Sequence, residues 1–149
     1  MLYVDTSVIV KLYIREKYSR EASDWLRINN EAIPITPFHV LEFTNAVNLK
    51  QYRNELSDEE VRIIFEKFSQ HEKMGVIHRP LINWSDVFTR STDLSKNHTH
   101  SIGSRSLDIL HVALALSLSA TRFLTFDERQ SQLALAAGLR IESCIVPGY

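Results

Sequence analysis

The chain has 149 residues, of which 44% are hydrophobic and 23% charged, values typical of one globular domain with a sizeable core. Its 17 basic and 18 acidic residues leave a net charge of −1, which gives no prior for a nucleic-acid-binding surface. No apolar run approaches the roughly 20 residues of a membrane span, and a single cysteine, Cys144, excludes an internal disulfide. With no signal-like N-terminus, these features predict a cytoplasmic protein without a membrane segment.

The first half of the chain alternates short apolar strands with helices. In chain order we expect a strand at Leu2–Val4, helices at Ser7–Ile14 and Ser19–Asn29, a strand at Ala32–Thr36, and a helix from Pro37 to about Asn54. The first strand ends at a carboxylate, Asp5. Ligands of an open parallel sheet bind just beyond the carboxyl ends of its strands, so Asp5 is the first candidate for a binding residue.

The second half continues the alternation, with clearer helix boundaries. We expect a helix that begins at the capping box of Ser57 and Glu60 and ends at Gly75, then a strand at Val76–His78, a helix from Trp84 to about Asn97 and a polar loop at His98–Arg105. An apolar helix at Leu107–Ala120, a strand at Arg122–Thr125, a helix between Asp127 and Gly138 and a strand at Leu139–Ser143 complete the chain. This alternation predicts an α/β fold, with one parallel sheet covered by helices on both faces. No linker or repeat interrupts it, so we expect a single domain over residues 1–149.

Four carboxylates occupy positions that a purely structural role explains poorly. Asp5 and Asp127 follow strands, and Asp108 lies in the first turn of the most apolar helix. Glu42 shares a helical stripe with small or apolar residues, namely Phe38, Asn45, Ala46 and Leu49, so we expect it to face inward or into a cleft. All four can meet at one end of the sheet, where their mutual repulsion would need a cation. Mg²⁺ and Mn²⁺ prefer such oxygen ligands.

Each acid also has a plainer interpretation. Asp5 and Asp127 can cap the helices that follow them, Asp108 can interact with its helix dipole, and Glu42 can reach solvent. The conjunction of two acids at strand ends with two on apolar helices favours the metal site.

Four segments carry a resemblance to a known family. They are Val4–Ile9, Leu41–Ala46, Leu107–Ala115 and Leu124–Asp127, and their order and spacing cover essentially the whole chain. Together they resemble the PIN domain, specifically the small toxin ribonucleases called VapC. The resemblance implies a three-layer α/β/α fold, with a parallel sheet of about five strands in the order 3-2-1-4-5. It also implies a homodimer held inactive by a VapB-type antitoxin.

The activity implied by the resemblance is metal-dependent hydrolysis of RNA by water. Asp5, Glu42, Asp108 and Asp127 would be the acidic quartet, holding one or two Mg²⁺ or Mn²⁺ ions. We expect Asp5 and Asp108 to be the most direct ligands. No residue nucleophile is needed.

Other residues can support this site. Thr6, Ser7 and Thr125 place hydroxyls beside the acids, suited to orienting them, although Thr6 and Ser7 can equally start a helix. Arg105 can pair with the acids or with phosphate. His111 lies three residues after Asp108 on the same helix face, and a packing role is favoured over acid–base catalysis.

Two alternatives stay open within this family: a solitary PIN nuclease in RNA processing, and a non-catalytic module that binds an antitoxin or RNA. A phosphotransferase of the haloacid dehalogenase type is disfavoured, because Asp5-Thr6-Ser7 lacks the second Asp of that motif.

Overall fold

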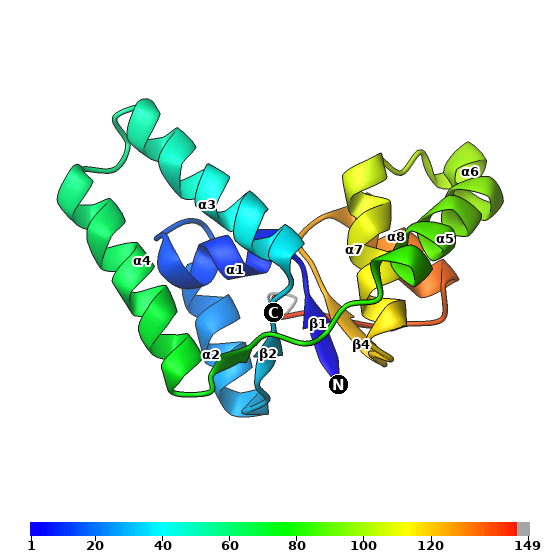
Figure 1. Cartoon of the computed structure of the whole chain (residues 1–149), viewed down its shortest axis with the longest axis horizontal. Coiled ribbons are helices and arrows are strands. Elements are labelled where there is room, and N and C mark those ends of the chain that lie inside the picture. Colours follow the sequence, from blue (N-terminus) through cyan, green and yellow to red (C-terminus); the bar gives the residue numbers. More distant parts are fainter. Residues whose placement is uncertain (146–149) are drawn as a thin grey trace. The chain divides into compact units, whose positions relative to one another are not determined.

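The structure, a computed structural model, describes residues 1–145 and contains strands and helices in alternation (Figure 1). The strands are β1 (Leu2–Val4), β2 (Ile33–Pro34), β3 (Ile77–His78), β4 (Arg122–Leu124) and β5 (Arg140–Glu142). The helices are α1 (Thr6–Tyr13), α2 (Ser19–Asn29), α3 (Pro37–Tyr52), α4 (Asp58–Lys73), α5 (Trp84–Leu94), the π-helix η1 (Ser95–Thr99), α6 (His100–Ile102), α7 (Ser106–Ser117) and α8 (Glu128–Ala136). Within this part of the chain, no helix combines the length and hydrophobicity needed to cross a membrane.

The chain divides into two compact units. Unit 1 comprises Met1–Asp5 and Pro80–Ser143, and unit 2 comprises Thr6–Arg79 together with Cys144 and Ile145. Each unit has its own core, and each is described separately below.

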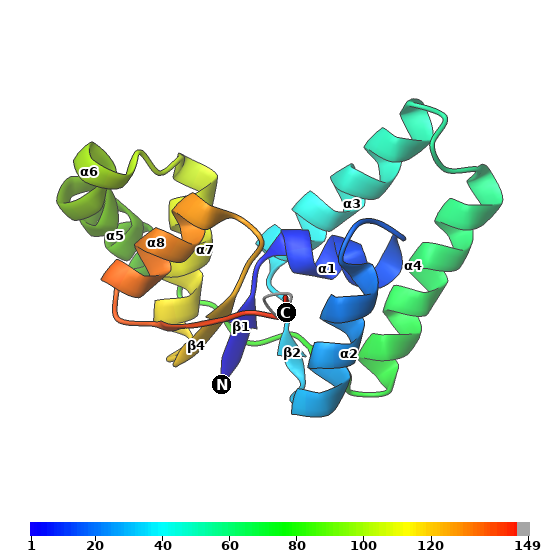
Figure 2. The ribbon, with the colours of Figure 1, turned by 180° about the vertical axis from the view of Figure 1, so that it is seen from behind.

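Unit 1 is built on a three-stranded parallel sheet in the order β1-β4-β5. Tyr3 of β1 pairs in register with Phe123 of β4, and their rings stack with centroids 5.4 Å apart. Figure 2 shows β1 and β4 side by side, with α7 and α8 beside them. Helix α7 is buried on several sides, as its apolar composition predicts.

Unit 2 combines helices α1 to α4 with a two-stranded parallel sheet, β2-β3. Helices α3 and α4 form a hairpin, visible in both ribbon views (Figures 1 and 2). An aromatic cluster joins α1, α3 and α4: the ring of Tyr13 lies 5.3 Å from that of Phe43, which stacks on Phe68 at 4.9 Å. The capping box of Ser57 and Glu60 at the start of α4 is confirmed.

The predicted α/β class with parallel strands is confirmed, but a single sheet in the order 3-2-1-4-5 is not. Strands β1, β4 and β5 pair as expected, and so do β2 and β3. Among the strand pairs of residues 1–145, however, β1 and β2 are not joined. Strand β2 has only two residues, and one of them is Pro34, whose nitrogen cannot donate a ladder hydrogen bond.

Two local predictions are wrong. The polar loop expected at His98–Arg105 is largely helical, because η1 and α6 continue from α5 until Gly103 adopts a left-handed backbone with φ 73°. On α3, the buried face carries Phe38, Phe43 and Val47. Leu49 and Asn45, expected to face inward with Glu42, are exposed.

Candidate functional site

Asp5 and Asp127 are linked in unit 1 through the hydroxyl of Thr125. The backbone N–H of Asp5 donates to the carbonyl of Leu124 at 3.2 Å, so the β1–β4 ladder extends to the carboxylate. Thr125, directly after β4, donates its hydroxyl to Oδ2 of Asp5 at 2.7 Å and accepts the backbone N–H of Asp127 at 3.0 Å. Asp5 is only 4% exposed. Thr125 therefore joins the carboxylate of Asp5 to the backbone N–H of Asp127, and the meeting of the two carboxylates stays a prediction.

Asp108 and Asp127 are linked through Arg105. Arg105 directly precedes α7, and its Nε lies 3.1 Å from Oδ2 of Asp108 in the first turn. Its Nη2 lies 3.6 Å from Oδ2 of Asp127. The hydrogen bond and charge of Asp108, with the charge of Asp127, raise the pKa of Arg105. Both acids thus direct one carboxylate oxygen at the same guanidinium.

Asp127 has two roles in the structure. Its Oδ1 accepts the backbone N–H of Gln130 at 2.8 Å and caps α8, as the sequence predicts. Its Oδ2 interacts with Arg105. The plainer interpretation of Asp127, as a helix cap, is therefore correct for one oxygen and leaves the other directed toward a cationic group.

The remaining predicted acid, Glu42, belongs to unit 2. It is half-buried on α3, and its Oε1 accepts the hydroxyl of Thr6 at 2.6 Å. Thr6 is the first residue of α1 and directly follows Asp5 in sequence. Ser7, next on α1, is also half-buried. Within unit 2, Thr6 therefore orients Glu42.

His111 is buried in unit 1 and bonded to a tyrosine that the sequence analysis did not connect with it. Its Nδ1 lies 2.8 Å from the hydroxyl of Tyr3 on β1, and both side chains are almost fully buried. This contact supports a packing role for His111. No sequence pattern points to the pair, because the two residues are 108 positions apart.

The site chemistry fits a hard divalent cation. The candidate ligands are carboxylates and their neighbours are hydroxyls, and Mg²⁺ and Mn²⁺ prefer oxygen. In unit 1, Asp5, Asp108 and Asp127 belong to one network through Thr125 and Arg105. Among residues 1–145, no three His, Cys, Asp or Glu side chains are grouped as a metal-binding set. Two of the candidate carboxylates are instead paired with a guanidinium.

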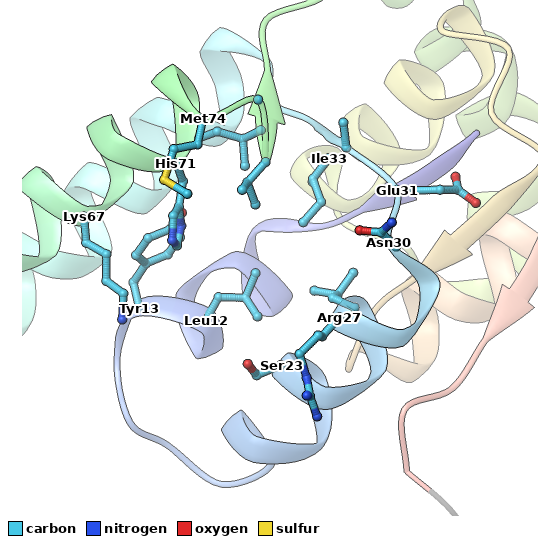
Figure 3. A pocket seen from close by; sticks show the side chains of 15 residues that line it. Leu12, Tyr13, Ser23, Arg27, Asn30, Glu31, Ile33, Lys67, His71 and Met74 are labelled. Carbon is cyan, nitrogen blue, oxygen red and sulfur yellow. The ribbon is translucent and has the colours of Figure 1, made fainter.

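A separate pocket of about 680 Å³ lies in unit 2, between α1, α2, the end of α4 and β3 (Figure 3). Apolar side chains such as Leu12 line it beside two cations, Arg27 and Lys67. On the wall of this pocket, the hydroxyl of Tyr13 and Nδ1 of His71 form a hydrogen bond of 2.7 Å. Burial, with a smaller effect of the Lys67 charge, lowers the pKa of His71. None of the four predicted acids lines this pocket.

Comparisons with known proteins agree with this architecture. The family model of the PIN domain matches residues 2–135. A search of curated proteins finds no match.

Several solved structures share the fold at low sequence identity. FitAcB from Neisseria gonorrhoeae has a TM-score of 0.69 and 19% identity, covering 97% of this chain and 98% of that one. VapC20 of Mycobacterium tuberculosis, described as a sarcin-ricin loop cleaving toxin, has a TM-score of 0.67 and 14% identity, with coverage of 99% and 100%. VapBC2 from Rickettsia felis, bound to a DNA fragment from their promoter, has a TM-score of 0.66 and 15% identity, with coverage of 95% and 98%.

Proposed function

The chain belongs to the PIN domain family, and on that premise we propose that it is a metal-dependent endoribonuclease. The observation that carries the proposal is the network of unit 1, in which Asp5, Asp108 and Asp127 are oriented by Thr125 and Arg105. Three acidic residues connected through Thr125 and Arg105, within a family of nucleases, favour chemistry on a phosphodiester over a purely structural role.

Asp5, Asp108 and Asp127 would hold Mg²⁺ or Mn²⁺, and Glu42 is the fourth acid that the sequence predicts for the set. A bound ion of this kind makes a water molecule more acidic and offsets negative charge on the phosphate. Thr125 fixes one oxygen of Asp5, and Thr6 fixes one oxygen of Glu42. Because Oδ1 of Asp127 caps α8, this residue can offer its Oδ2 without breaking the cap.

The test is a cleavage assay on purified protein free of any partner. Structured RNA should be cut with Mg²⁺ or Mn²⁺, and chelation should stop the reaction. Asp5→Asn and Asp108→Asn should each lower the rate by at least about 100-fold. Asp93→Asn is the matched control, because Asp93 is an exposed aspartate of α5 in the same unit. If Asp5→Asn and Asp108→Asn cleave as fast as Asp93→Asn, the assignment of the acids is wrong.

We further propose that the protein is the toxin of a VapBC-type pair and a homodimer acting on RNA in the cytoplasm. The supporting observation is the likeness to the solved structures of FitAcB, VapC20 and VapBC2. An acidic site attracts a basic segment, so we expect an antitoxin that places an Arg near the acids. Co-expression with the product of a short neighbouring reading frame should yield a complex without cleavage activity.

Two other outcomes have distinct signatures. Cleavage without any co-purifying partner would point to a solitary PIN nuclease in RNA processing. Partner or RNA binding without cleavage under any divalent metal would point to a non-catalytic module. Mapping cut sites in cellular RNA after brief induction, beside the Asp5→Asn variant, would identify the substrate.

A further inference from the structure

Arg105 is placed to interact with the predicted metal site from its solvent side. It precedes α7 with an extended backbone, at φ −86° and ψ 157°. Its side chain is 72% exposed, whereas that of Asp108 is 12% exposed and that of Asp127 34% exposed. The guanidinium therefore covers the two carboxylates while remaining largely in water.

The oxygens that Arg105 binds are among those a metal ion would need. Both contacts are to Oδ2 atoms, and Oδ1 of Asp127 already caps α8. A guanidinium is charged at every accessible pH, and its planar fork can serve two carboxylates at once. A divalent cation that takes these Oδ2 atoms as ligands therefore competes with Arg105 for them, and the positive charge of the guanidinium opposes its entry.

Displacement of Arg105 is feasible because its ion pairs are exposed. Breaking one exposed ion pair changes a binding constant by at most about fivefold, so the two ion pairs of Arg105 together lower the metal affinity only modestly. A divalent ion with several oxygen ligands can still bind, but at a higher concentration than it would need without the arginine.

We propose that Arg105 is an internal competitor of the metal ion and sets the metal concentration at which the site fills. The inference rests on the proposed function and adds regulation of that same site. Arg105 is here a positioning residue: it holds Asp108 and Asp127 in the metal-free protein and leaves them when the ion binds.

The experiment measures Mn²⁺ affinity directly, by the loss of the electron paramagnetic resonance signal of free Mn²⁺. The proteins compared are the wild type, Arg105→Gln and Arg140→Gln. Arg140 is a matched control, because it is 70% exposed in the same unit and pairs with Glu142 at 2.9 Å, away from the acids of the network. Arg105→Gln should bind Mn²⁺ about two- to tenfold more tightly than the wild type, and Arg140→Gln should be unchanged.

A second readout follows the arginine itself. In ¹⁵N-arginine-labelled protein, Mg²⁺ should move the Nε–Hε resonance of Arg105 and leave that of Arg140 in place. Thermal unfolding of Arg105→Gln checks that the variant is folded, which is expected for so exposed a side chain.

The outcomes separate the two proposals. Equal or weaker Mn²⁺ binding by Arg105→Gln, or an Arg105 resonance unmoved by Mg²⁺, overturns the competitor role and leaves the nuclease proposal standing. A raised KM for RNA with unchanged Mn²⁺ affinity also overturns it, because Arg105 would then contact phosphate. No Mn²⁺ binding by any of the proteins overturns the metal-dependent function and this inference with it.

Discussion

The hydroxyl of Thr125 contacts both the carboxylate of Asp5 and the backbone N–H of Asp127, so its removal is a sharp perturbation of the site. Thr125→Val keeps the shape of the side chain and removes a 2.7 Å hydrogen bond to Asp5 and a 3.0 Å bond from the backbone N–H of Asp127. A hydrogen bond to a charged group contributes about 1.5–3 kcal/mol and a neutral one about 0.5–1.5 kcal/mol. Because Thr125 is half-buried, we expect the lower end of the sum, a loss of about 2 kcal/mol in unfolding free energy.

The assay is urea unfolding at pH 7, with two comparison variants. Thr125→Ser retains the hydroxyl and should recover most of the loss. Thr121→Val is the matched control just before the same strand, because the Thr121 hydroxyl is exposed and 3.5 Å from the carbonyl of Met1, too far for a strong bond. Its loss should stay below about 0.5 kcal/mol.

A second measurement connects stability with the site. If Thr125 orients Asp5 as a ligand, Thr125→Val should weaken Mn²⁺ binding by about 10-fold or more. Equal stability losses in Thr125→Val and Thr121→Val would refute the hydrogen-bond reasoning. A loss confined to stability, with Mn²⁺ affinity intact, would refute the orienting role.

Two further predictions concern buried and bridged polar groups. Burial alone would raise the pKa of Glu16, but hydrogen bonds from Lys11 and Lys50, at 3.2 Å each, outweigh burial and lower it below its usual 4.5. The carboxylate therefore stabilises the fold above pH 4.5, and this stabilisation is lost as pH falls through the lowered pKa. In urea unfolding, Glu16→Gln should lower the unfolding free energy by about 0.5–1 kcal/mol at pH 6 and by progressively less below pH 4.5. Tyr3→Phe removes a 2.8 Å hydrogen bond to buried His111 and should lower the unfolding free energy by about 1–2 kcal/mol; an unchanged urea midpoint would show that the bond contributes nothing.

Features governed by neighbours in sequence were predicted well. The capping box of Ser57 depends on a residue three positions later, and so does the cap of Asp127. Gly138 follows α8 with φ 90°, as its position predicts. In these cases a side chain or a glycine interacts with the end of its own helix, so all the residues involved lie within a few positions of one another in the sequence.

Features that depend on packing were predicted less well. A run of polar residues predicts a loop at His98–Arg105, but polar residues also form exposed helix, as in η1 and α6. The inward stripe of α3 was misjudged because mixed composition allows more than one face to be buried. The capping box of Thr36 was missed because its partner is His39 rather than the usual Glu or Gln. The second contact of Arg105, with Asp127, joins residues whose proximity depends on how β4 lies beside α7.

Asp127 offers a way to separate the two interpretations that its sequence position allowed. Asparagine can still accept the backbone N–H of Gln130 with its side-chain oxygen, and it caps helices about as well as aspartate. Asp127→Asn should therefore keep most of the unfolding free energy, whereas Asp127→Ala should lose about 1 kcal/mol more. Both variants remove the charge that faces Arg105 at 3.6 Å and would face a metal ion. Urea unfolding and Mn²⁺ titration on the same samples should thus show two variants that differ in stability but share weakened binding. If Asp127→Asn binds Mn²⁺ and cleaves RNA like the wild type, helix capping is the whole role of this carboxylate, and Asp127 is not one of the ligands of the metal ion.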